Sequence, residues 1–176
     1  MSETAPDGAG NGIGNGSGNG SGNAPDAGLP GLRVLAQYLK DHSFENPRAP
    51  MSFRDGGAAP GIEVNVDVNA RGLGGGQFEV ELAVSARARR GQDVVFVVET
   101  TYAGVFEIVN VPDNQIEPIL LIECPRLLFP FARQIVAETT SSGNFPPVML
   151  DPIDFMMIYQ RNVAAREGAQ PQALNA

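Results

Sequence analysis

Strict alternation of apolar and polar residues marks two strands, over residues 62–69 and 78–86. The apolar positions of the first are Ile62, Val64, Val66 and Val68. A period of two places one set of side chains against a core and leaves the other in water. The glycine-rich stretch 72–76 between the two strands predicts a turn, so the pair forms an antiparallel hairpin.

A third strand, over residues 93–101, has a different character. Residues 94–98 read VVFVV and are apolar at consecutive positions, which predicts a strand that is covered on both faces. In a small antiparallel sheet the second cover must come from helices or from another subunit. The pattern therefore predicts an oligomer that buries residues 94–98.

Helical spacing replaces alternation beyond Pro112. We expect a short helix over residues 113–123 and a second helix over residues 125–142 that stops at Gly143, with a bend or a helix start near Pro130. The segment is interrupted by prolines at positions 112, 118, 125, 130, 146, 147 and 152. Apolar side chains on short, interrupted helices suit an open hydrophobic groove better than a catalytic cleft.

The last helix has the clearest start and stop signals. Asp151 is its expected N-cap, Pro152 its first helical position and Gly168 its end, while Asp154 favours the helix N-terminus electrostatically. Its expected inward stripe is Phe155, Met156, Tyr159 and Val163. Residues 32–44, in contrast, carry signals for either a helix or a strand, and periodicity alone favours a helix.

The composition divides the chain into three parts. Residues 1–30 form a leader that is expected to be disordered and to add nothing to a core, because over residues 10–23 glycine alternates with mostly Asn and Ser. Residues 31–168 are the foldable domain, and residues 169–176 are a flexible tail. The strict alternation in the leader never produces the spacing of a phosphate-binding glycine loop.

The charge is acidic, with 20 Asp and Glu against 12 Lys and Arg and a net charge of −8. This balance disfavours nucleic acid as a ligand and favours a partner with a basic surface. The N-terminus lacks the features of a signal peptide, and no apolar run approaches membrane-spanning length. We therefore expect a cytoplasmic protein without membrane insertion, and its single cysteine, Cys124, fits a reducing compartment.

The residues that carry chemistry do not form a recognisable catalytic or metal site. His42 is the single histidine and is expected to be a half-exposed strand residue. Cys124 is expected to be a buried, inert thiol, and Glu79 and Glu81 to be solvated surface on one strand face. We therefore expect no enzyme activity, no metal and no cofactor.

Several short segments in a fixed order give the chain a resemblance to a known family. They are KDHSFENP at 40–47, GVF at 104–106, CP at 124–125, LFPFAR at 128–133, FPP at 145–147 and LDP at 150–152. In their order and spacing they resemble the SecB family of bacterial protein-export chaperones over roughly residues 33–163. The leader is longer than the family needs, and Val98 stands where some relatives have cysteine.

The resemblance implies an α+β fold, with a four-stranded antiparallel sheet and C-terminal helices packed against it. It also makes the second half of residues 32–44 an edge strand and implies a homotetramer built as a dimer of dimers. The implied function is ATP-independent: such proteins hold non-native precursor proteins in hydrophobic grooves and deliver them to the SecA ATPase. An oligomeric adaptor dedicated to one defined partner, such as an antitoxin, is the alternative.

Two sets of site residues are expected, the first from the resemblance and the second from residue type. The residues that match SecA-binding positions are Asp41, Glu45, Val97 and Glu99. Aromatic anchors and flexible methionines suit a groove that accepts many clients, and each of them is also a normal core residue. The residues expected to line the client groove are Tyr102, Phe106, Phe129, Phe131, Phe155 and Met156.

Overall fold

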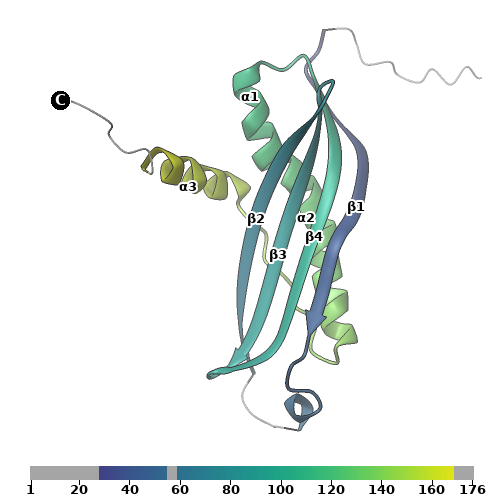
Figure 1. Ribbon diagram of the computed structural model, residues 1–176, viewed down its shortest axis with the longest axis vertical. Helices are drawn as coiled ribbons and strands as arrows, with labels where there is room; N and C mark the ends of the chain where they lie inside the picture. Colours follow the sequence, from purple (N-terminus) through teal and green to yellow (C-terminus); the bar gives the residue numbers. More distant parts are fainter. Residues whose placement is uncertain (1–27, 55–58, 169–176) are drawn as a thin grey trace, which may run out of the picture.

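A computed structural model describes residues 28–54 and 59–168 of the chain. Four antiparallel strands form one sheet in the order β1-β4-β3-β2 (Figure 1). The strands are β1 (Gly31–Glu45), β2 (Gly61–Gly74), β3 (Gln77–Arg90) and β4 (Asp93–Val109). The expected fold class, a four-stranded antiparallel sheet with C-terminal helices, is confirmed. Nearly all of the expected leader and the whole expected tail lie outside the described residues.

Strand β1 lies at one edge of the sheet and pairs with β4 from Gly31 to Glu45, so the helix favoured by periodicity is wrong. The register shifts twice, between Val34 and Ala36 and between Leu39 and Asp41. Each shift is a β-bulge, where an extra residue interrupts the alternation of side chains. Two such interruptions explain why the apolar residues of this strand follow no period of two.

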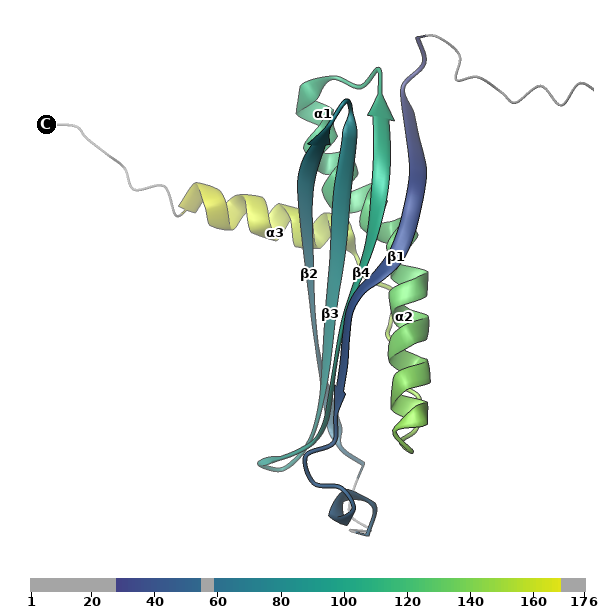
Figure 2. The same ribbon diagram turned by 45° about the vertical axis from the view of Figure 1, so that its right-hand side comes forward.

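A nearly continuous helical run crosses one face of the sheet diagonally (Figures 1 and 2). It comprises α1 (Asp113–Pro118), the π-helix η2 (Ile119–Glu123) and α2 (Cys124–Ser142). Helix α2 agrees with the expected helix of residues 125–142, and because it continues through Pro130 no helix begins there. Pro118 and Pro125 flank the π-helix, whose wider turn lets the chain stay helical where proline interrupts α-helical hydrogen bonds.

Two glycines allow α2 to lie close to the sheet. A Cβ atom at Gly104 of β4 would lie 2.8 Å from the ring of Phe106 and 3.0 Å from Leu128. A Cβ atom at Gly143, just after α2, would lie 2.3 Å from the ring of Phe44. The helix therefore buries Leu128, Ala132 and Val136 completely. We call this side of the sheet the covered face, and the opposite side, on which no helix of the described residues lies, the open face (Figure 2).

The consecutive apolar residues 94–98 have a local explanation. Phe96 pairs with Ala88 and Val94 with Arg89, so Val95 is the extra residue of a third bulge. Val95 and Phe96 are both buried, at 4% and 2% exposure. Val94 and Val97 remain partly exposed. The bulge turns two neighbouring residues inward, so the run of apolar residues does not by itself require a second covering subunit.

Helix α3 (Phe155–Gly168) begins later than expected and projects beyond the β2 edge of the sheet (Figure 1). Its cap is Asp154, whose Oδ1 accepts a hydrogen bond from the N–H of Met157 at 3.1 Å. Asp151 and Pro152 precede the helix because residues 147–153 form an irregular segment that is neither helix nor strand, with Val148 and Leu150 buried. Of the expected inward stripe, Phe155 is buried and Met156 is 41% exposed.

None of the helices among the described residues is long and apolar enough to span a membrane.

Candidate functional site

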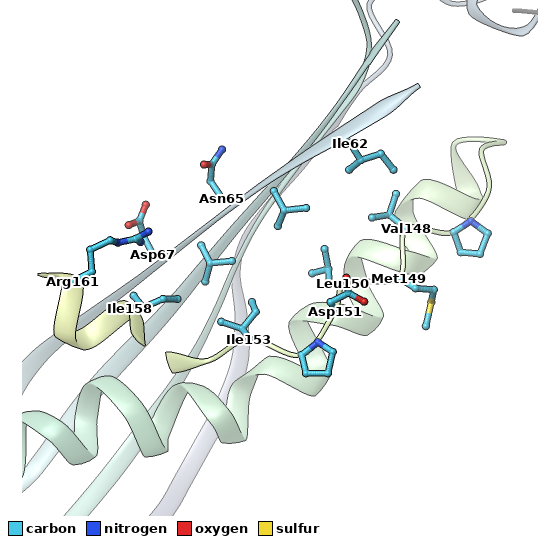
Figure 3. Close-up of a pocket in the computed structure, with 14 residues that line it drawn as sticks. Ile62, Asn65, Asp67, Val148, Met149, Leu150, Asp151, Ile153, Ile158 and Arg161 are labelled. Atoms are coloured by element: carbon cyan, nitrogen blue, oxygen red, sulfur yellow. The ribbon is translucent and has the colours of Figure 1, made fainter. Parts of the chain in front are cut away.

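An open groove of about 690 Å³ lies between edge strand β2, the irregular segment 147–153 and α3 (Figure 3). Helix α2 lies on β3 and β4, so it leaves the apolar side chains of β2 incompletely covered. Ile62 and Val64 are therefore 46% and 44% exposed. We call this feature the β2 groove. Its apolar walls come from Ile62, Val64, Val66, Val148, Leu150, Ile153 and Ile158.

The two ends of the β2 groove differ in chemistry. Asp67 and Arg161 lie together at the end formed by α3, and Ile62 and Val148 lie toward the other end (Figure 3). Ile62 and Val148 also line a second hollow of about 400 Å³, so the two hollows adjoin. An apolar track thus follows the edge strand beyond the limits of the first groove.

Aromatic rings line the second hollow, which we call the aromatic hollow. Phe145 lies 4.8 Å from Phe96 and 5.4 Å from Phe53, measured between ring centroids. Phe53 belongs to the 3₁₀-helix η1 (Met51–Phe53) and is 46% exposed. Phe44 extends the cluster from β1, with its centroid 6.0 Å from that of Phe96.

None of the six expected client-groove residues lines the β2 groove or the aromatic hollow. The structure brings four of them together in two pairs, one of which is Phe129 and Phe155, with ring centroids 6.1 Å apart. Phe106 and Phe155 lie in the core, at 0% and 1% exposure, because they fill the space between the sheet and the helices. Tyr102 stacks on Phe131 at 5.5 Å. Phe129 belongs to the core at 9% exposure, whereas Phe131 and Met156 are exposed at 44% and 41%.

The groove-lining residues were missed because the expectation weighed aromatic side chains on broken helices. The relevant signal was the alternation Ile62, Val64, Val66, which identifies a strand but not its place in the sheet. Only the strand order puts β2 at an edge, where an apolar face stays open. Nothing local to residues 62–68 carries that information.

The open face brings together the four residues expected to bind SecA. In the register of β1 and β4, Glu45 lies opposite Val97 and Ser43 opposite Glu99, so Glu99 is a diagonal neighbour of both Asp41 and Glu45. All three carboxylates are exposed. We call Asp41, Glu45 and Glu99 the acidic patch. Within residues 28–54 and 59–168, no salt bridge reaches any of the three.

Farther along the open face, Glu79 of β3 is buried at 3% exposure, so the expectation of a solvated carboxylate is wrong for it. The hydroxyl of Tyr38, Nε of Arg71 and Nζ of Lys40 all donate to its carboxylate, with Lys40 at 3.1 and 3.2 Å. The Tyr38 hydrogen bond, helped by Arg71 and Lys40, lowers the pKa of Glu79 to about 2 against the opposing effect of burial. Lys40 also bridges to Glu81.

The remaining candidate groups are structural in this chain. His42 links three elements, because its Nδ1 lies 2.9 Å from Oγ1 of Thr100 in β4 and its Nε2 lies 2.9 Å from Oγ1 of Thr139 in α2. Cys124 is fully buried, which raises the pKa of its thiol to about 12. No cluster of metal-ligating side chains occurs among the residues that the structure describes.

The model of one protein family, described as SecB: Preprotein translocase subunit SecB, matches residues 26–166. The chain belongs to the SecB family. A protein-export protein SecB from Maricaulis maris is 55% identical over 142 residues, which cover 81% of this chain and 83% of the relative. Another, from Mesorhizobium japonicum, is 56% identical over 140 residues, or 80% of this chain and 84% of the relative.

A solved structure supports the fold of this SecB-family chain. The SecB-like chaperone Rv1957 of Mycobacterium tuberculosis, in complex with a ChAD peptide from the Rv1956 HigA1 antitoxin, superposes with a TM-score of 0.57. The match covers 69% of this chain and 90% of that protein at 14% identity, so it speaks for the fold alone. The names of the sequence relatives bear out the family and the export-chaperone role that the resemblance implied.

Proposed function

We propose that this SecB-family chain is an ATP-independent chaperone that holds non-native precursor proteins in the β2 groove and presents them to the SecA ATPase through its open face. One observation carries the proposal. The apolar groove and the exposed acidic patch lie on opposite faces of one sheet. A client and a basic partner can therefore be bound at the same time.

The β2 groove fits a client defined by chemistry rather than by sequence. Its walls are aliphatic, the adjoining aromatic hollow accepts large side chains, and the outer edge of β2 has no strand partner within the sheet. An extended client can add backbone hydrogen bonds along such an edge, and these bonds are the same for every client. Exposed apolar residues of many unfolded chains can then fill the two hollows.

A matched pair of substitutions on β2 tests this assignment. Ile62 and Leu73 lie on the same strand at 46% and 48% exposure, but only Ile62 lines the two hollows. Ile62→Asp should weaken the binding of several unrelated unfolded proteins by about 10-fold or more, because it places a charge in the apolar wall. Leu73→Asp adds the same charge outside the hollows and should leave binding within about twofold.

If the two variants lost the same affinity for unfolded proteins, the β2 groove would not be the client site. Binding measurements with several unrelated unfolded proteins also test the alternative of an adaptor dedicated to one partner, such as an antitoxin. A dedicated adaptor would ignore unrelated unfolded proteins, whereas a chaperone binds several of them.

The proposal includes a cytoplasmic homotetramer, a dimer of dimers. Exposed apolar residues on both elements flanking the β1 edge support an association. Leu39 of β1 and Phe131 of α2 are 47% and 44% exposed. Light scattering at micromolar concentration should give the mass of four chains, and a monomer under those conditions would count against this part of the proposal.

A further inference from the structure

Alternation along β1 changes at one point, and the change decides which residues reach the open face. Tyr38 donates to Glu79, which lies on the open face because its neighbour Val80 is in the core. Strict alternation from Tyr38 would send Lys40 and His42 to the open face and Asp41 to the covered face. The observed contacts of His42 are the reverse, because its ring reaches Thr139 of α2 on the covered face.

The bulge between Leu39 and Asp41 accounts for this reversal. Leu39 pairs with Tyr102 and Asp41 with Thr101, two adjacent residues of β4, so Lys40 is the extra residue with no partner in the register. A bulge of this kind shifts the following residues to the other face and re-aims their side chains. It therefore places Asp41 and Glu45 on the open face, and the acidic patch depends on it.

The side chain of the extra residue is anchored. Nζ of Lys40 lies 3.1 and 3.2 Å from the two carboxylate oxygens of Glu79 and also bonds to Glu81, both on β3. Strand β4 lies between β1 and β3, so Lys40 reaches across a whole strand. Glu79 is itself held from β2 by Arg71. One buried carboxylate thus links the bulge in β1 to both β3 and β2.

We propose that Lys40, held by Glu79 and Glu81, is a positioning residue that fixes the β1 bulge and thereby aims Asp41 at the docking partner. The inference rests on the SecA docking proposed above, and it concerns residues outside the acidic patch. Lys40 touches no partner in this account. It acts through the backbone on the carboxylate that follows it in the chain.

The direction of the change in SecA affinity on removing Lys40 distinguishes a positioning role from a simple charge effect. Removing the positive charge of Lys40 makes the open face more acidic, so simple electrostatics predicts tighter docking of a basic partner. Positioning predicts the opposite, because a loosened bulge leaves Asp41 in the competent orientation for only a fraction of the time. Lys40→Met should therefore weaken SecA binding by about 2- to 5-fold, in proportion to that fraction.

The experiment measures SecA affinity and client affinity for full-length Lys40→Met, Lys40→Arg and Arg71→Met by titration calorimetry. Lys40→Arg keeps a cation for Glu79 and should restore docking. Arg71→Met removes a partner of Glu79 but not the anchor of the bulge, so it should change docking by less than about twofold. Client affinity should stay constant throughout. If Lys40→Met fails to fold, Lys40→Gln, which keeps an amide donor, replaces it.

A background with Asp41→Asn and the signals of His42 complete the test. In that background Lys40→Met should no longer weaken docking, because the carboxylate that it aims is gone. His42 is the single histidine of the chain, so its imidazole NMR signals report on the stretch beside the bulge. Lys40→Met should shift or broaden them, and Arg71→Met should not.

Unchanged His42 signals together with unchanged or tighter SecA binding in Lys40→Met would overturn the inference. The docking proposal has its own test in Glu99→Lys. If Glu99→Lys weakens docking and Lys40→Met does not, the positioning role is wrong and the docking face stands. If Glu99→Lys has no effect, the docking face is wrong, and unperturbed His42 signals would then reject the anchoring role separately.

Discussion

Both ends of the open face carry carboxylates, but at one end a carboxylate is buried and hydrogen-bonded, whereas those at the other end are exposed. At one end Glu79 is buried and accepts hydrogen bonds from Tyr38, Lys40 and Arg71. At the other end Asp41 and Glu99 are exposed, and no salt bridge reaches them in the part of the chain that the structure describes. The first end is occupied in holding the sheet together, whereas the second is where we propose that a partner docks. A count of acidic residues cannot make this distinction, which depends on the strand register.

The largest expected effect concerns the buried end. Glu79→Gln should lower the free energy of unfolding by about 1.5–3 kcal/mol, because it replaces a charged acceptor of several hydrogen bonds by a neutral amide. Asp41→Asn should change it by less than about 0.5 kcal/mol, because that side chain is exposed and makes no salt bridge with any residue that the structure describes. Urea unfolding at a fixed protein concentration compares the two. Similar values would mean that the ends do not differ.

The second effect concerns the exposed end. Glu99→Lys combined with Asp41→Lys should weaken SecA binding by about 1–3 kcal/mol if the contact is partly desolvated, and by less if it stays exposed. Glu107→Lys reverses a charge at the far end of the same face, where Glu107 pairs with Arg33 at 2.5 Å, and serves as the control. Titration calorimetry against SecA and one unfolded precursor measures both surfaces. Equal losses for both ligands would show that the surfaces are not separate.

The third effect is a dependence on pH. The pKa of Glu79 is lowered from its ordinary value of 4.5 to about 2, so the charged form stabilises the folded state. This contribution is fully present above about pH 4.5 and is lost as the pH falls toward 2. The wild-type protein should therefore lose more unfolding free energy than Glu79→Gln over this window. Parallel curves from urea unfolding between pH 5 and 2.5 would contradict the assignment.

The smallest effect is a difference in salt response. Raising the salt concentration should weaken SecA binding, because exposed charges are screened over distances of about 10 Å at 0.1 M. The stability difference between wild type and Glu79→Gln should change little, since the carboxylate is 3% exposed and its partners are in direct contact. Repeating both measurements at several salt concentrations checks this, and a salt-independent SecA affinity would argue against docking through the acidic patch.

The strands with regular alternation were predictable, and those with bulges were not. Residues 62–69 and 78–86 lie in β2 and β3 as their alternation indicates. The sequence of strand β1 resembled that of a helix because two bulges remove its period of two. Residues 94–98 appeared to be covered on both faces of the sheet because Val95 is a bulge residue. A bulge depends on the partner strand, so a single-strand pattern cannot reveal it.

The site was predictable only in part. The resemblance selected Asp41, Glu45, Val97 and Glu99, and the structure places them side by side, while their role stays a prediction. The groove residues depend on strand order, which periodicity does not encode. The start of α3 was misplaced because Asp151 and Pro152 form a good local cap, whereas burial of Val148 and Leu150 keeps that segment out of the helix.

Gly143 links the end of α2 to the shape of the aromatic hollow. Its Cα leaves room for the ring of Phe44, which a Cβ atom would meet at 2.3 Å, and Phe44 in turn packs against Phe96 and Phe145 in the wall of that hollow. Any larger residue at 143 must push this ring toward its aromatic neighbours. In the proposed client site, Gly143→Ala should therefore alter the size of client side chain that the hollow accepts, without touching the client. The capacity of the hollow is thus a property that one backbone position, outside its lining, can tune.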